Sequence, residues 1–182
     1  MKVIQKEYNV NGVSYSIRLA INKDAKELSE VRLQIDGETQ NLDREKGEAY
    51  IDKSGFEEII QTDNAKMNNL FLVAVINERI VGYSRCEGNH LKRYAHKVEF
   101  GVCVLKDYWG LGIGTNLLKE CCTWADSNGI NKITLNVLET NEKAINLYKK
   151  FGFKIEGILE NDKFLSDGQY YNTIVMGRFI ME

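Results

Sequence analysis

Three glycines alternate in the stretch Gly110-Leu111-Gly112-Ile113-Gly114, between an apolar, strand-like run that ends at Val104 and an amphipathic helix. Glycines at a helix start leave backbone N–H groups uncovered, and the helix N-terminus adds roughly half a positive charge directed the same way. The stretch therefore predicts a cradle for a phosphate or diphosphate. It is formed by Gly110, Leu111, Gly112, Ile113, Gly114 and Thr115.

The glycine spacing alone leaves several ligands open. A nucleotide triphosphatase loop needs Gly-x-x-x-x-Gly-Lys-Ser/Thr, and here Thr115 follows Gly114 without a lysine. A dinucleotide fingerprint needs Gly-x-Gly-x-x-Gly close to a strand end, whereas these glycines begin well past Val104; Glu139 would nevertheless imitate its ribose-binding acid. The remaining alternatives are a coenzyme A diphosphate site and a glycine-rich turn that only starts a helix.

A second motif follows the next strand-like run, in the stretch Asn141-Glu142-Lys143-Ala144-Ile145-Asn146-Leu147-Tyr148-Lys149-Lys150-Phe151-Gly152-Phe153. Taken with the glycine loop, it resembles the GNAT N-acetyltransferase superfamily, with its Gln/Arg-x-x-Gly-x-Gly/Ala loop and its later Asn-x-x-Ala-x-x-x-Tyr-x-x-x-Gly-Phe helix. The resemblance runs from about Val98 to Met176, and it is strongest to small bacterial members that end in a Gly-Phe-x-x-Glu-Gly strand and an Asp-Gly hairpin, here Asp167-Gly168. One position departs, because Trp109 stands where Gln or Arg is usual.

The resemblance implies an enzyme that transfers an acetyl group from acetyl-CoA to a primary amine while both substrates are bound. The pantetheine arm would lie along Val102, Cys103 and Val104 as an added strand, with the diphosphate on the backbone of Gly110–Thr115. Asn141 would hydrogen-bond the pantetheine amides, although a plain helix N-cap explains this residue equally well. An inactive coenzyme A-binding regulatory module and a nucleotide-dependent oxidoreductase or kinase are the alternative functions.

Two residues are candidates for catalysis. The resemblance implies that Tyr148 contacts the coenzyme sulfur as general acid, since a phenol stays protonated at neutral pH; a core tyrosine is the alternative. Glu99 is the one carboxylate in the apolar run 98–104, and its burial would raise its pKa and suit it to act as base. It could instead be an exposed strand-end residue or pair with Arg79 or Arg85. Asn136 would face the cleft but cannot accept the proton.

Composition indicates a single globular domain over residues 1–182, with 43% hydrophobic and 27% charged residues. The resemblance implies that this is an N-acetyltransferase domain. A net charge of −2 argues against nucleic acid as a partner, and no apolar run is long enough to span a membrane. We see no signal peptide and expect a cytoplasmic protein. A homodimer is left open. The cysteines show no metal-ligand spacing, so we expect no metal and four reduced thiols: Cys86, Cys103, Cys121 and Cys122.

Periodicity and turn residues place the elements that hold these groups. Hairpins are expected around Asn11-Gly12 and Asn77-Glu78. Helices are expected from Asp24, from Ser54, from Ile113 to Gly129 and from Asn141 to Phe151, each of the first two with the named residue as N-cap. Strands at 95–104 and 133–138 bracket one helix and should be parallel neighbours. We therefore predict a mixed α/β fold with a mostly antiparallel central sheet, helices on both faces and a parallel pair at the cofactor site.

The acceptor amine is not specified by these motifs; a small molecule, a polyamine or a peptide N-terminus all fit. Its binding groups should come from residues 24–65 and from the hairpin at Asp167-Gly168. The first of these segments has an acidic excess that favours a cationic amine, although solvated helix faces explain it as well. These acidic residues are Asp36, Glu38, Asp43, Glu45, Glu48, Asp52, Glu57 and Glu58.

Overall fold

The computed structural model describes residues 5–180, which form an eight-stranded sheet with the order β1-β2-β3-β4-β5-β6-β8-β7. The strands are Lys6–Val10 (β1), Val13–Leu19 (β2), Leu70–Ile76 (β3), Arg79–Gly88 (β4), Lys97–Val104 (β5), Lys132–Leu138 (β6), Lys154–Phe164 (β7) and Tyr170–Phe179 (β8). The helices are Ala25–Asp36 (α1), Lys53–Ala65 (α2), Ile113–Ser127 (α3) and Glu142–Lys150 (α4). Short 3-10 turns occupy Asn22–Asp24, Lys92–Tyr94 and Lys106–Tyr108.

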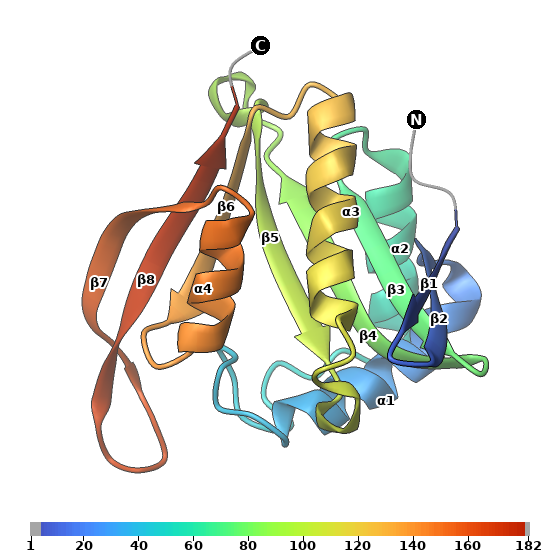
Figure 1. Ribbon diagram of the computed structural model, residues 1–182, viewed down its shortest axis with the longest axis horizontal. Coiled ribbons are helices and arrows are strands. Elements are labelled where there is room, and N and C mark those ends of the chain that lie inside the picture. Colours follow the sequence, from blue (N-terminus) through green and yellow to red (C-terminus); the bar gives the residue numbers. More distant parts are fainter. Residues whose placement is uncertain (1–4, 181–182) are drawn as a thin grey trace.

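The β5–β6 pair is parallel, and the other neighbouring strands of the sheet pair antiparallel. Figure 1 shows α3 and α4 in front of the sheet and α2 behind it, with α1 packed against α2. The predicted fold class is therefore confirmed. None of the helices in residues 5–180 has the length and apolarity that crossing a bilayer requires.

Both predicted hairpin turns are present, and their residues adopt the left-handed conformation that such turns need. Asn11 and Gly12 have φ of 53° and 81°, and Asn77 and Glu78 have φ of 47° and 65°. The part of the first predicted strand at residues 3 and 4 lies outside the described residues.

Of the two predicted N-caps, Asp24 has the predicted position but makes no capping hydrogen bond, and Ser54 is wrong in position. Asp24 occupies the N-cap position of α1, but its carboxylate instead binds the Arg18 guanidinium at 2.7 and 2.8 Å. The cap of α2 is Asp52, which accepts a hydrogen bond from the Gly55 amide at 2.8 Å, while Ser54 lies within the first turn. Asp and Ser are both good capping residues, so composition could not choose between two of them so close together.

The parallel pair of strands separates part-way along its length. The ladder joins Lys97–Glu99 to Lys132–Thr134, and from Phe100 onward β5 and β6 diverge, as Figure 1 shows. The opening splits the sheet near its centre and leaves the edge of β5 between residues 100 and 104 next to a gap rather than next to a strand. This gap positions the site described below.

Alternate residues of β4 and β5 face opposite layers of the molecule. Ser84 on one face contacts Cys121 of α3, with 3.4 Å between oxygen and sulfur. Tyr83 on the other face stacks edge-on against Phe71, whose ring lies 6.4 Å from that of Phe56 in α2. The sheet therefore packs against α3 on one face and against α1 and α2 on the other, and the gap between β5 and β6 is lined by residues from both sides.

Candidate active site

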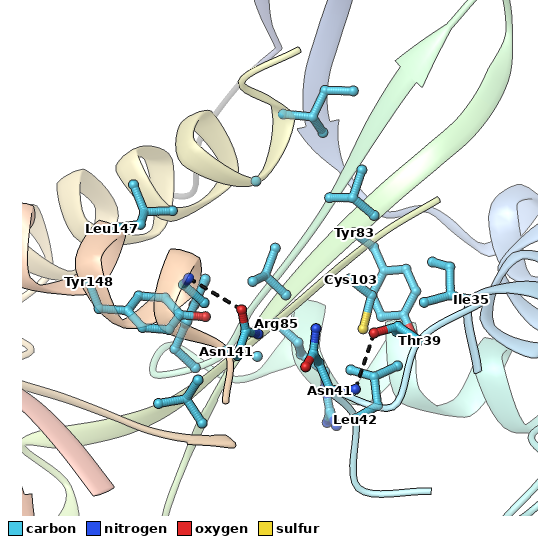
Figure 2. A pocket seen from close by; sticks show the side chains of 18 of the residues that line it. Ile35, Thr39, Asn41, Leu42, Tyr83, Arg85, Cys103, Asn141, Leu147 and Tyr148 are labelled. Carbon is cyan, nitrogen blue, oxygen red and sulfur yellow. Dashed lines mark hydrogen bonds between the residues drawn. The ribbon is translucent and has the colours of Figure 1, made fainter. Parts of the chain in front are cut away.

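A cavity of about 1010 Å³ occupies the gap between β5 and β6. On the α3 and α4 side its wall includes Gly112, Gly114, Asn141 and Tyr148, and on the α1 and α2 side it includes Arg32, Ile59 and Tyr83. Figure 2 shows Tyr148 and Asn141 on one side of this cavity and Tyr83, Cys103 and Thr39 on the other. The cavity therefore reaches both faces of the sheet at one point.

The predicted anion cradle lies at the start of α3. Gly112 is the N-cap, and Gly110 and Gly112 have φ of 84° and 73°, which side-chain-bearing residues rarely adopt. The first helical hydrogen bond runs from the Asn116 amide to the Gly112 carbonyl at 2.9 Å. The amides of Ile113, Gly114 and Thr115 therefore precede the helical ladder and have no helical acceptor.

Gly114 differs from the other two glycines of the loop. It lies in the first turn of α3 without a positive φ, and a Cβ built on it would meet only Val104 Cγ2, at 3.8 Å. Neither backbone strain nor packing explains this glycine, whereas the close approach of a ligand to the helix end does. The residues present therefore fit a bound diphosphate.

Trp109, the residue that departs from the family pattern, closes the end of β5. Its indole N–H donates a hydrogen bond to the Val104 carbonyl at 2.8 Å, while the residue stays 45% exposed at the cavity wall. This hydrogen bond could not be read from the sequence, because it depends on the 3-10 turn at Lys106–Tyr108 that folds the loop back on the strand.

Asn141 is the N-cap of α4, and its side-chain oxygen accepts a hydrogen bond from the Ala144 amide at 3.3 Å. The capping interpretation is therefore confirmed. The residue also lines the cavity, and its amide nitrogen is a donor that the cap does not use.

Tyr148 lies on the buried face of α4 and lines the cavity. Its ring packs edge-on against Phe100, with 6.4 Å between centroids, and against Phe153 at 5.8 Å. Burial, with a smaller contribution from Cys103, raises the pKa of Tyr148 to about 12. The phenol is therefore protonated at neutral pH.

Glu99 lies on the cavity wall, but the expected burial is wrong, because the residue is exposed. It is directly opposite Glu87 in the β4–β5 register, at the level where β6 leaves β5. A carboxylate beside the gap meets the cavity and solvent instead of an apolar layer. The structure agrees with the alternative of an exposed residue. The other alternative, pairing with Arg85, is not seen among the described residues, since the Arg85 guanidinium binds Asp63 and Glu87.

The far side of the cavity contains functional candidates that the sequence did not reveal. Arg32 and Arg44 line it together with Tyr83 and Asn41, and none of these belongs to a recognisable motif. The predicted acidic patch lacks one of its members at the surface, because Asp36 is 5% exposed and its carboxylate binds Arg44 at 2.7 Å. Only the order of the elements, which stacks α1 on the face of β4, brings these residues together.

The thiols are free, as expected, in all four cysteines. Cys103 is half-buried on β5 and lines the cavity between Val102 and Val104. Burial raises the pKa of this thiol, and Tyr83 and Arg44 lower it part of the way back. Among residues 5–180, no group of three or more His, Cys, Asp or Glu side chains is placed to hold a metal ion.

The profile of the "Acetyltransferase (GNAT) family" matches residues 37–153, which include both motifs, the β5–β6 gap and most of the cavity wall. This chain belongs to the GNAT acetyltransferase family. The predicted resemblance is therefore confirmed, and the cavity has the family's two sequence motifs at one end.

Two curated relatives from Escherichia coli (strain K12) carry different acceptors in their names. L-amino acid N-acetyltransferase AaaT is 33% identical over 59% of this chain, and spermidine N(1)-acetyltransferase is 35% identical over 58%. The matched regions span 66% and 55% of the lengths of these two relatives, respectively. The relatives therefore leave the acceptor of this chain open.

Solved structures agree on the fold. An acetyltransferase of the GNAT family from Streptococcus pneumoniae has a TM-score of 0.88 and 29% identity, and the match covers 91% of this chain and 99% of that one. A GNAT superfamily phosphinothricin acetyltransferase from Sinorhizobium meliloti, solved in complex with AcCoA, has a TM-score of 0.80 and 18% identity, over 91% of this chain and 88% of that one. The second likeness shows the fold alone.

Proposed function

We propose that this protein transfers an acetyl group from acetyl-CoA to a primary amine by direct attack while both substrates are bound. The observation that carries the proposal is the single cavity that opens to both faces of the sheet, with the α3 amides and Tyr148 on one face. Two ligands that enter from opposite faces would meet at the gap between β5 and β6. This arrangement suits direct transfer between them, without a covalent enzyme intermediate.

The coenzyme would bind on the α3 and α4 side. Its diphosphate would accept hydrogen bonds from the amides of Gly110–Thr115, where the α3 dipole also favours negative charge. The pantetheine arm would lie against the free edge of β5 at Val102, Cys103 and Val104, with the side-chain amide of Asn141 as a further donor. When bound, acetyl-CoA supplies an acetyl thioester at the gap.

Tyr148 would act as the general acid. As the amine nitrogen bonds to the acetyl carbon and the C–S bond breaks, the sulfur takes the phenolic proton of Tyr148. Burial favours this role in one respect, because the raised pKa keeps the proton on the phenol until the sulfur needs it. The ring contacts with Phe100 and Phe153 hold the phenol in place.

Glu99 would accept the proton that the attacking amine loses, directly or through water. Its support is its position, since the residue lies on the cavity wall where β5 leaves β6, on the face opposite to Tyr148. The two proton-transfer groups would thus act from the two faces of the gap.

Two measurements test this function. Acetyl-CoA should raise the melting temperature, while NAD and ATP should not, because only a ligand of the native state stabilises it. Thiol release from acetyl-CoA should then depend on an added amine. A thermal shift without amine-dependent thiol release would instead indicate a coenzyme A-binding module, and a shift with NAD or ATP alone would indicate the nucleotide-dependent alternatives.

A further inference from the structure

Three cross-strand pairs line the acceptor side of the cavity, on the face of β4 and β5 that α1 and α2 cover. They are Tyr83–Cys103, Arg85–Gly101 and Glu87–Glu99, in order along the strands. Successive pairs are about 7 Å apart, because every second residue of a strand faces the same side. The middle pair leaves room, since a Cβ built on Gly101 would meet no atom within 4 Å.

One end of this row has an excess of positive charge. Beside Tyr83 and Cys103, the cavity wall includes the guanidinium groups of Arg32 and Arg44, with Asp36 as their shared carboxylate. Asp36 binds Arg44 closely at 2.7 Å, whereas its distance to Arg32 is 4.0 Å. The Arg32 side chain donates to the Ala49 carbonyl at 2.8 Å, and a guanidinium has five N–H donors.

The remaining acidic group of this end does not cancel that charge. Asp43 also lines the cavity, but its carboxylate is paired with Lys163 of β7. Burial, with a smaller contribution from the neighbouring Cys103 thiol, raises the pKa of Tyr83 well above its usual value, so its hydroxyl stays protonated beside that thiol and can donate. Arg32, Arg44 and Tyr83 therefore present hydrogen-bond donors and a net positive charge to the same part of the cavity.

The other end of the row is negative. Arg85 in the middle is already compensated, because Asp63 binds it through both carboxylate oxygens and Glu87 lies 3.0 Å away. Glu87, the second partner of Arg85, and Glu99 both lie at this end, which therefore has more carboxylates than guanidiniums. The cavity is therefore bipolar, with the empty position at Gly101 between its two ends.

An amine and a carboxylate on the same carbon match this spacing. In an α-amino acid, the amine nitrogen is separated from a guanidinium that binds the carboxylate by the N–Cα, Cα–C and C–O bonds and one hydrogen bond. This distance is about 6 Å. The distance from the Gly101 level to the Cys103 level is about 7 Å. An apolar wall formed by Ile35, Ile59 and Phe71 lies beside the positive end. Such a wall favours an apolar side chain.

We propose that the acceptor is an α-amino acid with an apolar side chain, whose carboxylate is bound by Arg32, Arg44 and Tyr83 while its amine lies at Gly101 and faces Glu99. This inference rests on the proposed acetyl transfer and narrows its acceptor. It replaces the sequence-based expectation of a cationic amine such as a polyamine. A polyamine would place an ammonium group beside two arginines that share one carboxylate, Asp36, and would bring no carboxylate of its own.

The test compares amines that differ only in the carboxylate. L-leucine, L-methionine and L-phenylalanine are assayed with acetyl-CoA against their amides and against spermidine, with thiol release as the readout. We expect kcat/KM for each amino acid to exceed that for its amide at least 100-fold. Amidation lowers the pKa of the amine and so favours its reactive neutral form, which means that amine ionisation cannot produce this preference.

Two variants locate the carboxylate site, and a third is their control. Tyr83→Phe keeps the buried ring and removes one donor, and Arg32→Gln removes the less tightly paired guanidinium; each should raise KM for the amino acid about 10-fold and leave the acetyl-CoA thermal shift unchanged. Arg79→Gln removes an exposed arginine outside the cavity and should change neither the KM for the amino acid nor the acetyl-CoA thermal shift. Arg44 is left intact because its loss would strand the buried Asp36 carboxylate.

Two outcomes would overturn the inference while the proposed function stands. One is turnover of the amides or of spermidine as fast as that of the amino acids. The other is thiol release with an amine outside this class while none of the three amino acids is turned over. Failure of the proposed function looks different, because no amine would then release thiol, with or without a thermal shift by acetyl-CoA.

Discussion

Tyr148 is held between the rings of Phe100 and Phe153, so its hydroxyl can be removed without disturbing the packing around it. We expect Tyr148→Phe to lower kcat about 100-fold, the usual scale for the loss of one general acid. The thermal shift with acetyl-CoA should be unchanged, because the ring remains. Steady-state kinetics beside a melting curve check both values. An unchanged kcat would make Tyr148 a core residue.

The raised pKa of Tyr148 has a consequence for the pH profile. Burial, and to a smaller degree Cys103, moves this pKa from 10.0 to about 12, so the folded protein keeps the phenolic proton through pH 10. We expect kcat to show no descending limb from this group between about pH 8 and 10. Above about pH 10 the unfolded chain ionises first, so this tyrosine then lowers the free energy of unfolding as the pH rises. The kcat profile of the wild type, with the Phe variant for comparison, measures the first effect.

Glu99 is the residue for which sequence reasoning and structure differ most. Its run of apolar neighbours predicted a buried carboxylate, and the divergence of β6 from β5 exposes it instead. We expect Glu99→Gln to lower kcat/KM about 10- to 100-fold and to remove the acidic limb of the profile, since an amide cannot accept the proton. Glu160→Gln, on the exposed edge strand β7, is the matched control and should keep the parent's kcat/KM and its acidic limb. If the Glu99→Gln enzyme keeps the parent's kcat/KM and the acidic limb of its pH profile, Glu99 is not the base and water accepts the proton.

At the scale of single elements, the start of α3 can be tested with little risk to the fold. Gly112 is a poor target, because its φ of 73° would strain any side chain. Gly114→Asp should fold, and its carboxylate at the helix N-terminus should even stabilise the free protein slightly. The same carboxylate should repel a diphosphate and abolish the acetyl-CoA thermal shift. Gly114→Asn has the same size without the charge and should retain part of that shift; equal shifts in both variants and the parent would show that the cradle lies elsewhere.

Asn141 combines a cap with a proposed ligand contact, and the two can be separated. Asn141→Asp keeps the oxygen that accepts from the Ala144 amide but loses the amide donor, so stability should hold while KM for acetyl-CoA rises about 10-fold. Asn141→Ala loses the cap as well and should cost about 1 kcal/mol of stability. Chemical denaturation and initial rates give the two values. If the Asp variant keeps the parent KM, Asn141 is a cap only.

The elements also show where sequence information is sufficient. Alternating apolar residues and Asn-Gly or Asn-Glu turns predicted the hairpins, and two strand-like runs that bracket a helix predicted the parallel β5–β6 pair, because these signals are local. The cap of α2 and the side-chain partner of Trp109 depend on how the chain bends after an element ends. Such bends are set by tertiary contacts, which the spacing of residues does not encode.

At the scale of the whole molecule, the proposed cofactor half and the proposed acceptor half of the cavity differ in how the sequence encodes them. The first comes from two continuous motifs, and most of the residues that they predict lie on the cavity wall, with Leu111 as an exception; their contacts with the coenzyme stay predictions. The second is assembled from α1, the loop after it, β4 and β5. Arg32 and Arg44 are far from β4 and β5 in the sequence and reach the cavity only because α1 and the loop pack on these strands. The single domain, the cytoplasmic location and a homodimer all stay predictions.

The acceptor half has one further connection that spans the chain. The loop between α1 and α2 lines the cavity with Thr39, Asn41 and Leu42, and it is tied to the β7–β8 hairpin. Gln40 donates to the Ser166 hydroxyl at 2.6 Å, and Lys163 is paired with Asp43. The hairpin thus supports the loop that closes the acceptor side, although its Asp167-Gly168 tip is not part of the cavity wall, contrary to the expected role of that turn in binding the acceptor.

This connection predicts an effect of distant residues on the acceptor alone. Lys163→Gln with Ser166→Ala should free the loop and raise KM for the acceptor a few-fold, because ties between partly exposed groups contribute little free energy each. The acetyl-CoA thermal shift should not change, since the cradle lies on the other face of the sheet. Raising the ionic strength should reproduce part of the effect in the parent by screening the ion pair. If instead both substrates were affected equally, the hairpin would support the whole sheet rather than the acceptor loop.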